Sequence, residues 1–517
     1  MDLSLHIRRG ARYWPERPAI LYRDRTVTYR QLDERSSRLA NALLGLGLRS
    51  GDRVAIQSRN CAEIVEIECA LYKAGLTKAA LNPRFTAAEA SDVVGNCTPA
   101  VMFAGEGFQN YSRETPGFSS VRHFIALAGE TAGYTRYESF VAQGSPVAPQ
   151  VEIADDEVAV LHFSSGSTGK IKAAMQTYGN RKASLRKFLM GNDYAATAGD
   201  RLALIGPMTH ATGMFMQPFM YHGGTLVVFD KFDPAHFLRS VQELRITHVF
   251  MVPAMINMIL AQPDLERYDL SSLKALSYGA APMAPARIIE AWERIGPILA
   301  QGYGGAETTS GVTRLTRADH AHAIAQRPER LSSCGRPLGE SDVRVVDAAG
   351  NEVSGDEIGE IVVRGDDVFK GYWGEPGLTA EVLVDGWYHT GDLAKVDDEG
   401  YIYLVDRKKD MIISGGFNVY PTEVEAVLYQ HPAVYEACVI SIPDDRWGES
   451  VKAVIALKPG ATATADELMA FCRSRLADYK MPRSVDFVTE LPKNPSGKIA
   501  RKVVREPYWA GRDRRVN

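Results

Sequence analysis

At positions 164 to 172 the chain reads Ser164-Ser165-Gly166-Ser167-Thr168-Gly169-Lys170-Ile171-Lys172. An apolar run at 158–163 precedes it, so the sequence predicts a buried strand that ends in a turn of glycines and hydroxyl side chains. Such a turn directs several backbone N–H groups and hydroxyls at one anion, and the lysines add positive charge. The stretch therefore predicts a phosphate-binding loop, with an ordinary polar turn as the open alternative.

Two better-known glycine loops do not fit this stretch. The Walker P-loop has Gly where Ser164 stands and Ser or Thr where Ile171 stands. The nucleophile elbow, Gly-x-Ser-x-Gly, fails around Ser167 because Ser165 replaces its first glycine. The loop therefore indicates neither a Walker-type site nor a serine nucleophile.

Four further stretches follow, and with the loop they carry a family resemblance. They are Gln301-Gly302-Tyr303-Gly304-Gly305-Ala306-Glu307, Tyr388-His389-Thr390-Gly391-Asp392, Asp406-Arg407-Lys408-Lys409-Asp410 and Pro495-Ser496-Gly497-Lys498. The chain resembles the adenylate-forming superfamily, which contains acyl- and aryl-CoA synthetases, luciferases and the adenylation domains of peptide synthetases. The resemblance implies an enzyme that uses ATP and Mg²⁺ to activate a carboxylic acid and passes the acyl group to CoA.

Composition and charge argue against several other classes of protein. The 517 residues suffice for roughly three to four domain-sized units. The apolar share of 45% and the charged share of 24% are typical of a soluble globular protein. A net charge of −4 argues against a nucleic-acid partner. No uninterrupted apolar run of about 18 residues occurs, so no integral membrane contact is predicted.

The cysteines and the chain ends favour a cytoplasmic protein. Six cysteines are scattered without a Cys-x-x-Cys pair, which is typical of reduced, buried thiols. Residues 1–9 lack an apolar segment after a basic patch, so no secretory signal is expected. The final residues carry no peroxisomal tripeptide.

The order of apolar and helical patterns predicts an α/β fold. Apolar runs at 202–205, 225–229 and 248–252 alternate with helices, which indicates a large N-terminal body of two βαβ-type subdomains. Residues 343–363 predict a smaller, more antiparallel, β-barrel-like unit. We expect an AMP-binding and acyl-pocket domain at 1–406, a hinge at 407–410 and a mobile α+β lid domain at 411–517, an architecture that the resemblance also implies.

Two local patterns in the lid lead to further expectations. Thr422 and Glu425 have the spacing of a capping box at the start of a helix. The C-terminal basic residues predict a solvated tail, with contact to a phosphate as the alternative. These residues are Arg501, Lys502, Arg505, Arg512, Arg514 and Arg515.

The chemistry needs a cation, because a carboxylate and the α-phosphate of ATP repel each other as they meet. The resemblance assigns this role to Lys498, which lies on a loop flanked by proline and glycine. Loss of its charge is expected to slow adenylation by orders of magnitude. Without the resemblance, an isolated loop lysine would be interpreted as a solvated charge.

The resemblance also implies which residues surround ATP. The loop is expected to hold the β- and γ-phosphates, Tyr303 to stack on adenine, Asp392 and Arg407 to bind the ribose, and Glu307 to bind Mg²⁺. The complete ATP set is Ser164, Ser165, Gly166, Ser167, Thr168, Gly169, Lys172, Gly279, Ala280, Ala281, Tyr303, Gly304, Asp392 and Arg407.

One position departs from the family pattern. Ala306 stands where a threonine usually precedes the metal-binding glutamate, and the lost hydrogen bond to a charged phosphate is worth on the order of 1–3 kcal/mol. Thr308 is two positions further on, and Ile171 and Ala173 replace the usual proline and glycine of the phosphate loop. Three consequences of these substitutions are left open: slower adenylation, an altered metal geometry, or an unusual reaction.

The resemblance places His210 beside the acyl pocket, where it shapes and gates the pocket and carries no proton. A buried structural histidine is the alternative. Met214, Met216 and Tyr278 are expected in the pocket and suit a fatty or aryl acid, although a Met-rich helix is as often plain core. No cationic side chain is clearly placed to bind a second carboxylate.

The second half-reaction needs a movable lid and a path for the thiol of CoA. Lys409 is expected at the hinge, and Ser414, Gly415 and Gly416 are expected to line the CoA tunnel. The surroundings of Lys498 also resemble sites that protein acetyltransferases modify, which would remove its charge. A homodimer is left open.

Three functions compete at this point. The first is an acyl- or aryl-CoA synthetase. The second is an adenylating enzyme that passes its acyl group to a carrier protein, an amine or another nucleophile. The third is a nucleotide-binding protein without turnover, which the presence of Lys498, Glu307, Asp392 and Arg407 disfavours.

Overall fold

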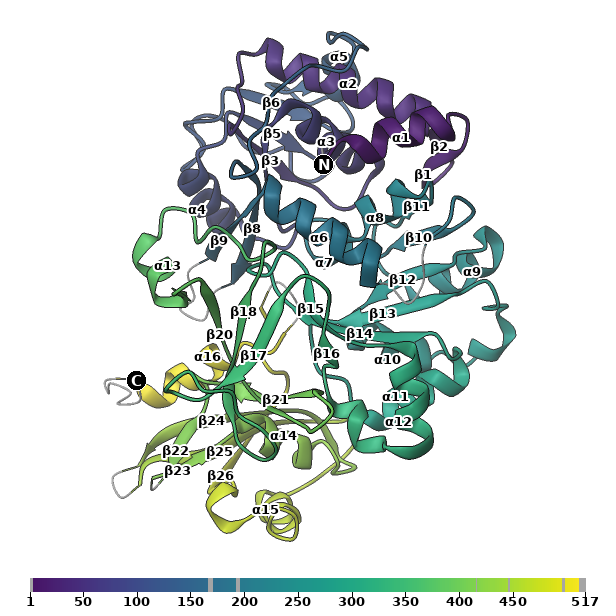
Figure 1. Cartoon of the computed structure of the whole chain (residues 1–517). Helices are drawn as coiled ribbons and strands as arrows, with labels where there is room; N and C mark the ends of the chain where they lie inside the picture. The colour runs from purple at the N-terminus through teal and green to yellow at the C-terminus, as the bar shows by residue number, and fades with distance from the viewer. Residues whose placement is uncertain are drawn as a thin grey trace. The chain divides into compact units, whose positions relative to one another are not determined.

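The computed structural model describes residues 3–165, 171–191, 196–414, 416–444, 447–494 and 498–510. The chain divides into two compact units, and Figure 1 labels their elements. Unit 1 comprises Met1–Ser164, Ile171–Val343 and Val363–Tyr388. Unit 2 comprises Ser165–Lys170, Arg344–Val362 and His389–Asn517.

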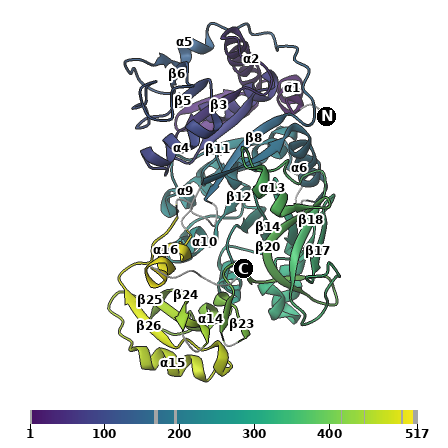
Figure 2. The same ribbon diagram turned by 90° about the vertical axis from the view of Figure 1, so that its left-hand side faces the viewer.

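One sheet of unit 1 has the strand order β7-β6-β5-β3-β4-β8-β9, and its strands from β7 to β8 are parallel. Figure 2 shows β6, β5 and β3 side by side. The strands are β3 (Arg53–Gln57), β4 (Thr77–Leu81), β5 (Val101–Ala104), β6 (His123–Ala126), β7 (Thr135–Arg136), β8 (Val158–Ser165) and β9 (Ile171–Thr177). Its central strands are buried on both faces, which explains their continuous apolar runs.

The second sheet of unit 1 has the order β16-β15-β14-β13-β12-β10-β11-β1-β2, parallel from β14 to β1 and antiparallel at both ends. Its strands are β1 (Pro18–Tyr22), β2 (Arg25–Thr28), β10 (Arg201–Leu204), β11 (Thr225–Val228), β12 (His248–Met251), β13 (Ala275–Gly279), β14 (Leu299–Gly304), β15 (Gly311–Leu315) and β16 (Arg336–Pro337). Parallel strands place their carboxyl ends on one edge, where ligands usually bind.

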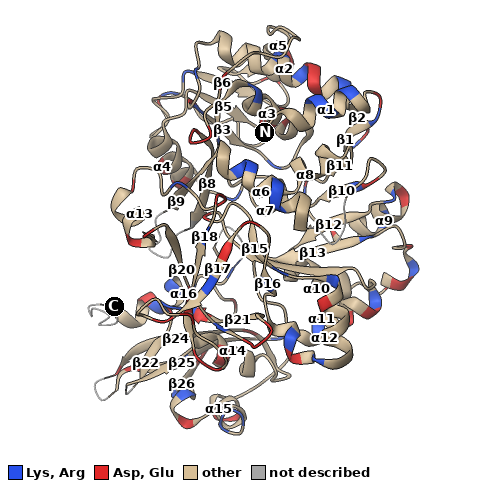
Figure 3. Cartoon of the chain, in the orientation of Figure 1, with Lys and Arg blue, Asp and Glu red and all other residues tan. Residues whose placement is uncertain are grey.

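Helices cover both sheets of unit 1. They are α1 (Leu5–Tyr13), α2 (Tyr29–Gly45), α3 (Ala62–Ala74), α4 (Ala87–Cys97), α5 (Tyr137–Val141), α6 (Tyr178–Gly191), α7 (Ala211–Met214), α8 (Met216–Tyr221), α9 (Pro234–Leu244), α10 (Pro253–Leu260), η1 (Leu265–Arg267), α11 (Pro285–Arg294), α12 (Arg317–Gln326), η2 (Pro328–Ser332) and α13 (Pro376–Val382). Their starts follow local rules: a capping box of Thr28 and Gln31 begins α2, and prolines begin α9, α10 and α11. Figure 3 shows both signs of charge on α9, α11 and α12.

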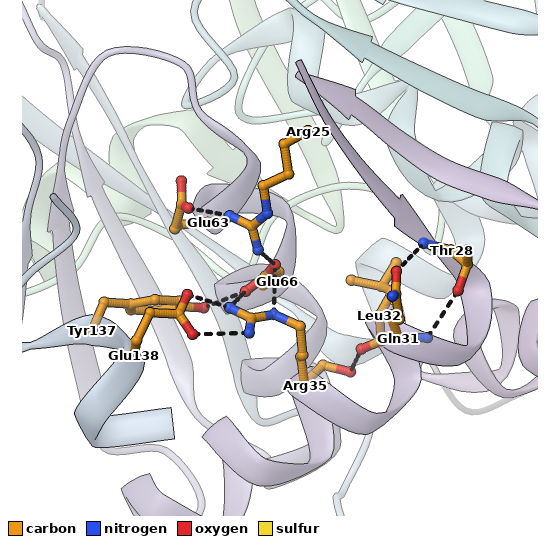
Figure 4. Close-up of polar contacts among 10 residues, drawn as sticks. Arg25, Thr28, Gln31, Leu32, Arg35, Glu63, Glu66, Tyr137 and Glu138 are labelled. Carbon is orange, nitrogen blue, oxygen red and sulfur yellow. Dashed lines mark hydrogen bonds and ion pairs between the residues drawn. The ribbon is translucent and has the colours of Figure 1, made fainter. Parts of the chain in front are cut away.

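A buried carboxylate ties α2, α3, α5 and β2 together (Figure 4). Glu66 is fully inaccessible and binds Arg25 at 2.8 Å and Arg35 at 2.9 Å. The Tyr137 hydroxyl donates to the same carboxylate at 2.9 Å, and Arg35 continues to Glu138 at 2.7 Å. Two guanidinium groups and a phenol thus satisfy a charge that would otherwise be costly to bury.

A smaller sheet has the order β17-β18-β20-β19, with β21 paired to β20. Its strands are β17 (Asp342–Val346), β18 (Gly359–Arg364), β19 (Leu383–Val384), β20 (Trp387–Val396) and β21 (Ile402–Arg407). The chain passes from one unit to the other inside β17, β18 and β20. This half-barrel-like sheet confirms the smaller antiparallel part predicted from 343–363.

The remainder of unit 2 is α+β. Its sheet has the order β23-β22-β25-β24, with β26 parallel to β25. The elements are β22 (Ile412–Ser414), β23 (Phe417–Val419), α14 (Pro421–Leu428), β24 (Val434–Asp444), β25 (Gly448–Leu457), α15 (Ala465–Arg473), η3 (Asp478–Lys480), β26 (Ser484–Val488), α16 (Arg501–Arg505) and η4 (Glu506–Trp509). Apolar residues of this sheet and of α14 and α15 form one core. The α/β prediction with an α+β C-terminal domain is confirmed.

Two local expectations in this part of the chain are wrong. Thr422 lies inside α14, whose first residue is Pro421, so it forms no capping box with Glu425. The Thr422 hydroxyl donates to the carbonyl of Val405, while Glu425 binds Arg501. Arg501 therefore does not belong to a solvated tail. Contacts with residues distant in sequence determine the roles of these side chains.

Two other findings concern the whole described chain. All six cysteines are buried and free of disulfides, as expected. Within the described ranges, no helix combines the length and apolarity needed to span a membrane.

Candidate functional site

In unit 1 the candidate adenine residues lie at the carboxyl ends of neighbouring strands. Gly279 ends β13 and pairs with Gly302 of β14, and a Cβ on Gly279 would lie 2.3 Å from the Gly302 carbonyl oxygen. Ala280 follows with a φ of 66°, in the left-handed region. Ala280 and Gly304 are exposed, and Ala281 and Tyr303 are half-buried. The structure therefore brings this part of the predicted ATP set together on one sheet edge.

The predicted metal ligand is held by a residue that the sequence analysis missed. Tyr372 donates its hydroxyl to Glu307 Oε1 at 2.9 Å. The ammonium of Lys172 lies 5.3 Å from the centre of the Tyr372 ring, a cation–π contact. Tyr372 thus links a predicted phosphate-binding lysine to the predicted metal-binding carboxylate.

The chemistry of Glu307 fits Mg²⁺. Mg²⁺ is commonly bound by one or two carboxylates, with waters and substrate phosphates supplying its other oxygens. In the described part of the chain, no cluster of three or more His, Cys, Asp or Glu side chains forms a cage for a metal. A single half-buried carboxylate beside the strand ends is therefore suited to an ion that arrives with the phosphates of ATP.

Thr308 does not replace the hydroxyl missing at Ala306. Its side chain is buried, donates to the Ser310 carbonyl at 2.7 Å and accepts from the Gly305 N–H at 2.9 Å. The Ala306 carbonyl accepts from Gln176 Nε2 at 2.8 Å. Thr308 therefore does not compensate for the threonine that Ala306 replaces.

His210 is half-buried, and its environment disfavours the protonated ring. Its Nδ1 lies 2.8 Å from the Thr209 hydroxyl, its Nε2 lies 3.5 Å from Asn82 Nδ2, and its ring meets that of His162 edge to face at 5.3 Å. Burial, followed by repulsion from Lys78 and Arg84, lowers the pKa of His210 from 6.5 to about 4. A histidine that is neutral near pH 7 fits the predicted shaping role and does not serve as a proton carrier at that pH.

The lowered pKa of His210 predicts a loss of stability in acid. Between pH 6.5 and 4 the unfolded chain binds a proton that the folded chain does not, so stability falls as the pH falls through this window. At pH 5 the penalty is about 2 kcal/mol. We expect His210→Gln to lose less stability than the wild type between pH 7.5 and pH 5, measured by urea unfolding. Replacement of the exposed His322 should leave this difference unchanged.

The predicted acyl-pocket residues belong largely to the core. Met216 is 2% exposed and packs in the core shared by α2, α3 and β10, whereas Met214 is half-buried. Tyr278 is fully buried, and its hydroxyl lies 2.9 Å from His320 Nε2. None of the three lines the cavity that borders β12 and β13.

In unit 2 three predicted residues lie together. Asp392 and Arg407 are cross-strand partners on β20 and β21, and the Arg407 guanidinium donates to the Asp392 carboxylate. Lys498 belongs to a turn in which its N–H donates to Asn494 Oδ1 at 2.9 Å. Although Lys498 as a residue is exposed, partial desolvation of its ammonium group lowers its pKa, as does Arg407, and Asp392 opposes this.

The charged segment at 406–410 is bound to the C-terminal helix by Arg501. The Arg501 guanidinium contacts Glu425 at 2.7 Å, Asp410 at 3.3 Å and Asp406 at 3.8 Å. Burial raises the pKa of both Asp406 and Glu425, against the attraction of Arg501. The predicted hinge residue Lys409 lies in an exposed turn beside this cluster.

Several predicted residues are only partly described or lie outside the described ranges. Ser164 and the backbone of Ser165 end strand β8, whereas Gly166, Ser167, Thr168 and Gly169 lie outside the described residues. Of the predicted CoA tunnel, Ser414 ends β22, Gly416 has a φ of 84°, and Gly415 is not described.

Comparison with known proteins identifies the family. Residues 7–373 match the model of the AMP-binding enzymes, and residues 423–498 match that of the AMP-binding enzyme C-terminal domain. A feruloyl-CoA synthase of an Amycolatopsis species is 40% identical over 502 residues, which cover 97% of this chain and 98% of that protein. A medium/long-chain-fatty-acid–CoA ligase of Mycobacterium tuberculosis is 35% identical over 97% of this chain and 89% of its own length.

Solved structures agree with this assignment. The amide bond synthetase McbA from Marinactinospora thermotolerans superposes with a TM-score of 0.87 at 30% identity, covering 98% of this chain and all of that one. The match extends over both described units. The chain therefore belongs to the AMP-binding enzymes, the adenylate-forming superfamily, and is of the acyl-CoA synthetase type.

Proposed function

We propose that this chain is an AMP-forming acid–CoA ligase. A carboxylate oxygen of the acid attacks the α-phosphorus of ATP, which gives acyl-AMP and releases pyrophosphate. The thiol of CoA, after losing its proton, then attacks the acyl carbon, which gives the thioester and releases AMP. ATP, Mg²⁺ and CoA are the cofactors of this reaction.

The grouping of Asp392, Arg407 and Lys498 in unit 2 supports this proposal most directly. The Asp392 carboxylate is suited to accept hydrogen bonds from the ribose hydroxyls, and Arg407 holds it in place. The Lys498 ammonium supplies the charge that lowers the repulsion between carboxylate and α-phosphate. Mg²⁺, when bound by Glu307, supplies further positive charge to the phosphates.

The proposal requires a conformational step. Lys498 belongs to unit 2, and Glu307 belongs to unit 1. After pyrophosphate leaves, CoA needs access to the acyl carbon. We propose that the lid, residues 411–517, then turns about Lys409, and that Ser414, Gly415 and Gly416 line the path of the pantetheine arm.

An acid panel tests the reaction. Fatty, benzoic and cinnamic acids are assayed for AMP release with ATP and Mg²⁺, with and without CoA. We expect at least one acid to give rapid AMP release that depends on CoA, together with an acyl-CoA product. Acid-dependent exchange of pyrophosphate into ATP without any thioester would contradict the CoA step and leave adenylation intact.

An amine acceptor is the second candidate. It is favoured by the similarity to an amide bond synthetase over the full chain and by Ala306, which departs from the family pattern. The same panel, run with amines and with a carrier protein in place of CoA, separates the two. Faster consumption of acyl-AMP by amines than by CoA would favour this candidate.

Three further statements stay predictions from the sequence: a homodimer, a cytoplasmic location and acetylation of Lys498. Exposure of Lys498 supports the last of these. Acetylation would remove the charge that adenylation needs, so full activity of a fully acetylated sample would contradict it.

A further inference from the structure

The segment 369–372 binds the predicted metal ligand, Glu307, at two points. The Tyr372 hydroxyl donates to Glu307 Oε1 at 2.9 Å, and the backbone N–H of Phe369 donates to the Glu307 carbonyl at 2.8 Å. One contact therefore holds the carboxylate and the other holds the backbone that carries it. Together they restrict how the Glu307 side chain can turn, so its carboxylate is oriented before a ligand arrives.

The Tyr372 ring is held in place by contacts other than the one to Glu307. It is 7% exposed and packs edge to face on Phe369 at 4.9 Å. The Tyr372 N–H donates to the Thr379 hydroxyl at 2.9 Å, and the residue forms an antiparallel bridge with Ala174 of β9. The phenol is therefore a fixed donor, and it determines the position of the carboxylate oxygen that it binds.

The turn that follows Glu307 is strained and bound to the same part of the chain. Thr309 is buried and has a φ of 58°, in the left-handed region, where a β-branched residue is an outlier that costs about 1–3 kcal/mol. Its hydroxyl donates to the Asp367 carbonyl at 2.7 Å. Such strain persists only where the surrounding contacts hold the backbone, and it is concentrated at functional sites. The strained turn therefore fixes the backbone from which the Glu307 side chain extends.

The two carboxylate oxygens of Glu307 have different surroundings. Oε1 accepts the phenol hydrogen, whereas no residue in the described ranges forms a hydrogen bond or ion pair with Oε2. A Cβ on Gly305 would lie 3.0 Å from Oε2, so glycine at this position keeps that oxygen approachable. Oε1 shares its electron density with the phenol hydrogen, which makes it the weaker ligand for a cation. Oε2 is therefore the oxygen suited to a metal.

The number of oxygens that a carboxylate offers affects which cation it binds. Mg²⁺ is small, demands a near-octahedral arrangement and keeps several waters, so a single carboxylate oxygen suits it. Ca²⁺ takes more oxygens at longer distances and also binds both oxygens of one carboxylate. A carboxylate restricted to one oxygen therefore favours Mg²⁺.

We infer that Tyr372 is a positioning residue for the metal of this enzyme: its phenol occupies Oε1 and makes Glu307 a one-oxygen ligand, which selects Mg²⁺ over Ca²⁺ as the cation bound with ATP. This inference rests on the proposed function. It adds a positioning residue and a physical basis for the choice of cation.

Nucleotide binding without acid tests this role, because no turnover then occurs. Calorimetry gives the Kd of ATP with Mg²⁺, of ATP with Ca²⁺ and of AMP without metal, for the wild type and for Tyr372→Phe. This substitution keeps the ring, and with it the contact to Lys172. The Kd of ATP with Mg²⁺ should rise about tenfold or more, because loss of a hydrogen bond to a metal ligand typically weakens metal binding by about 10- to 100-fold. The Kd of ATP with Ca²⁺ should change less than about threefold, and that of AMP should stay unchanged.

Tyr111→Phe is the matched control. Tyr111 is also 7% exposed, and its hydroxyl donates to Gln57 Oε1 at 2.9 Å, the same distance as in the pair of Tyr372 and Glu307. Its loss should lower the melting temperature to a similar extent and leave all three Kd values unchanged. Equal effects of the two substitutions on binding of ATP with Mg²⁺ would show a merely structural role for Tyr372 and overturn the inference.

Infrared difference spectra of the wild type give a second measurement, which needs no substitution at Tyr372. The two C–O stretching bands of a carboxylate are widely separated when one oxygen binds a metal and closer together when both do. We expect a wide separation for the bands that appear with ATP and Mg²⁺ and disappear in Glu307→Gln. A narrow separation would overturn the one-oxygen role of Glu307.

The outcomes distinguish this inference from the proposed function. If the wild type forms acyl-AMP but Tyr372→Phe keeps both the affinity for ATP with Mg²⁺ and the preference over Ca²⁺, the inference is overturned and the proposed function stands. If ATP binding by the wild type does not depend on a divalent cation and no acid is activated, both are overturned.

Discussion

Replacement of Lys498 by alanine is expected to abolish the first half-reaction and spare the second. Without the ammonium, the carboxylate and the α-phosphate repel each other unscreened, and acyl-AMP formation should slow by about 10²–10⁴-fold. Thioester formation from supplied acyl-AMP involves no such approach of two anions, so it should stay within a few-fold of the wild-type rate. Pyrophosphate release and acyl-CoA formation from synthetic acyl-AMP measure the two steps separately.

Lys502→Ala is the matched control. It removes an exposed lysine four residues further along the chain and should leave both half-reactions unchanged. An equal loss of both steps in Lys498→Ala would show that Lys498 supports the fold or a later step. Full adenylation activity in Lys498→Ala would remove its proposed role.

Replacement of Arg501 by methionine is expected to destabilise unit 2 strongly. Its guanidinium is the cation shared by Glu425, Asp410 and the buried Asp406. Removal of this guanidinium takes the cation away from the largely buried Glu425 and Asp406, and breaking a buried ion pair on one side typically costs about 3 kcal/mol or more. Urea unfolding and hydrogen exchange of α14 and α16 should both show this loss.

Arg505→Met provides the comparison, because Arg505 approaches Asp410 only at 3.9 Å. Its loss should cost less than about 1 kcal/mol. Equal stabilities of the two variants would contradict the account of the cluster. The destabilisation by Arg501→Met should also shrink at low pH, where the carboxyl groups take up protons and no longer need a cation.

The sequence predicted the architecture well where local patterns determine the structure. The apolar run before Ser164 forms strand β8, and the alternation of strands and helices gives the parallel sheets of unit 1. The prediction failed at Thr422 and Arg501. Their spacing matched a local motif or a polar tail, but contacts with distant segments determine their positions.

The candidate site shows the same limit. Ordered motifs predicted Glu307, Asp392, Arg407 and Lys498 as site residues, yet no motif indicates that Tyr372 contacts Glu307 from 65 residues away in sequence. Likewise, the sequence does not show which side chains line the cavity at β12 and β13. Arg314 lines it because β15 folds back beside β14, and strand pairing of this kind is not visible in a single local pattern.

The central claim is that a carboxylate oxygen of the acid attacks the α-phosphorus of ATP. The most direct test is a single reaction with an acid labelled with ¹⁸O in its carboxylate, followed by mass spectrometry of the products. The account predicts that AMP carries one ¹⁸O atom and that pyrophosphate carries none. Unlabelled AMP, or label in pyrophosphate or inorganic phosphate, would contradict it.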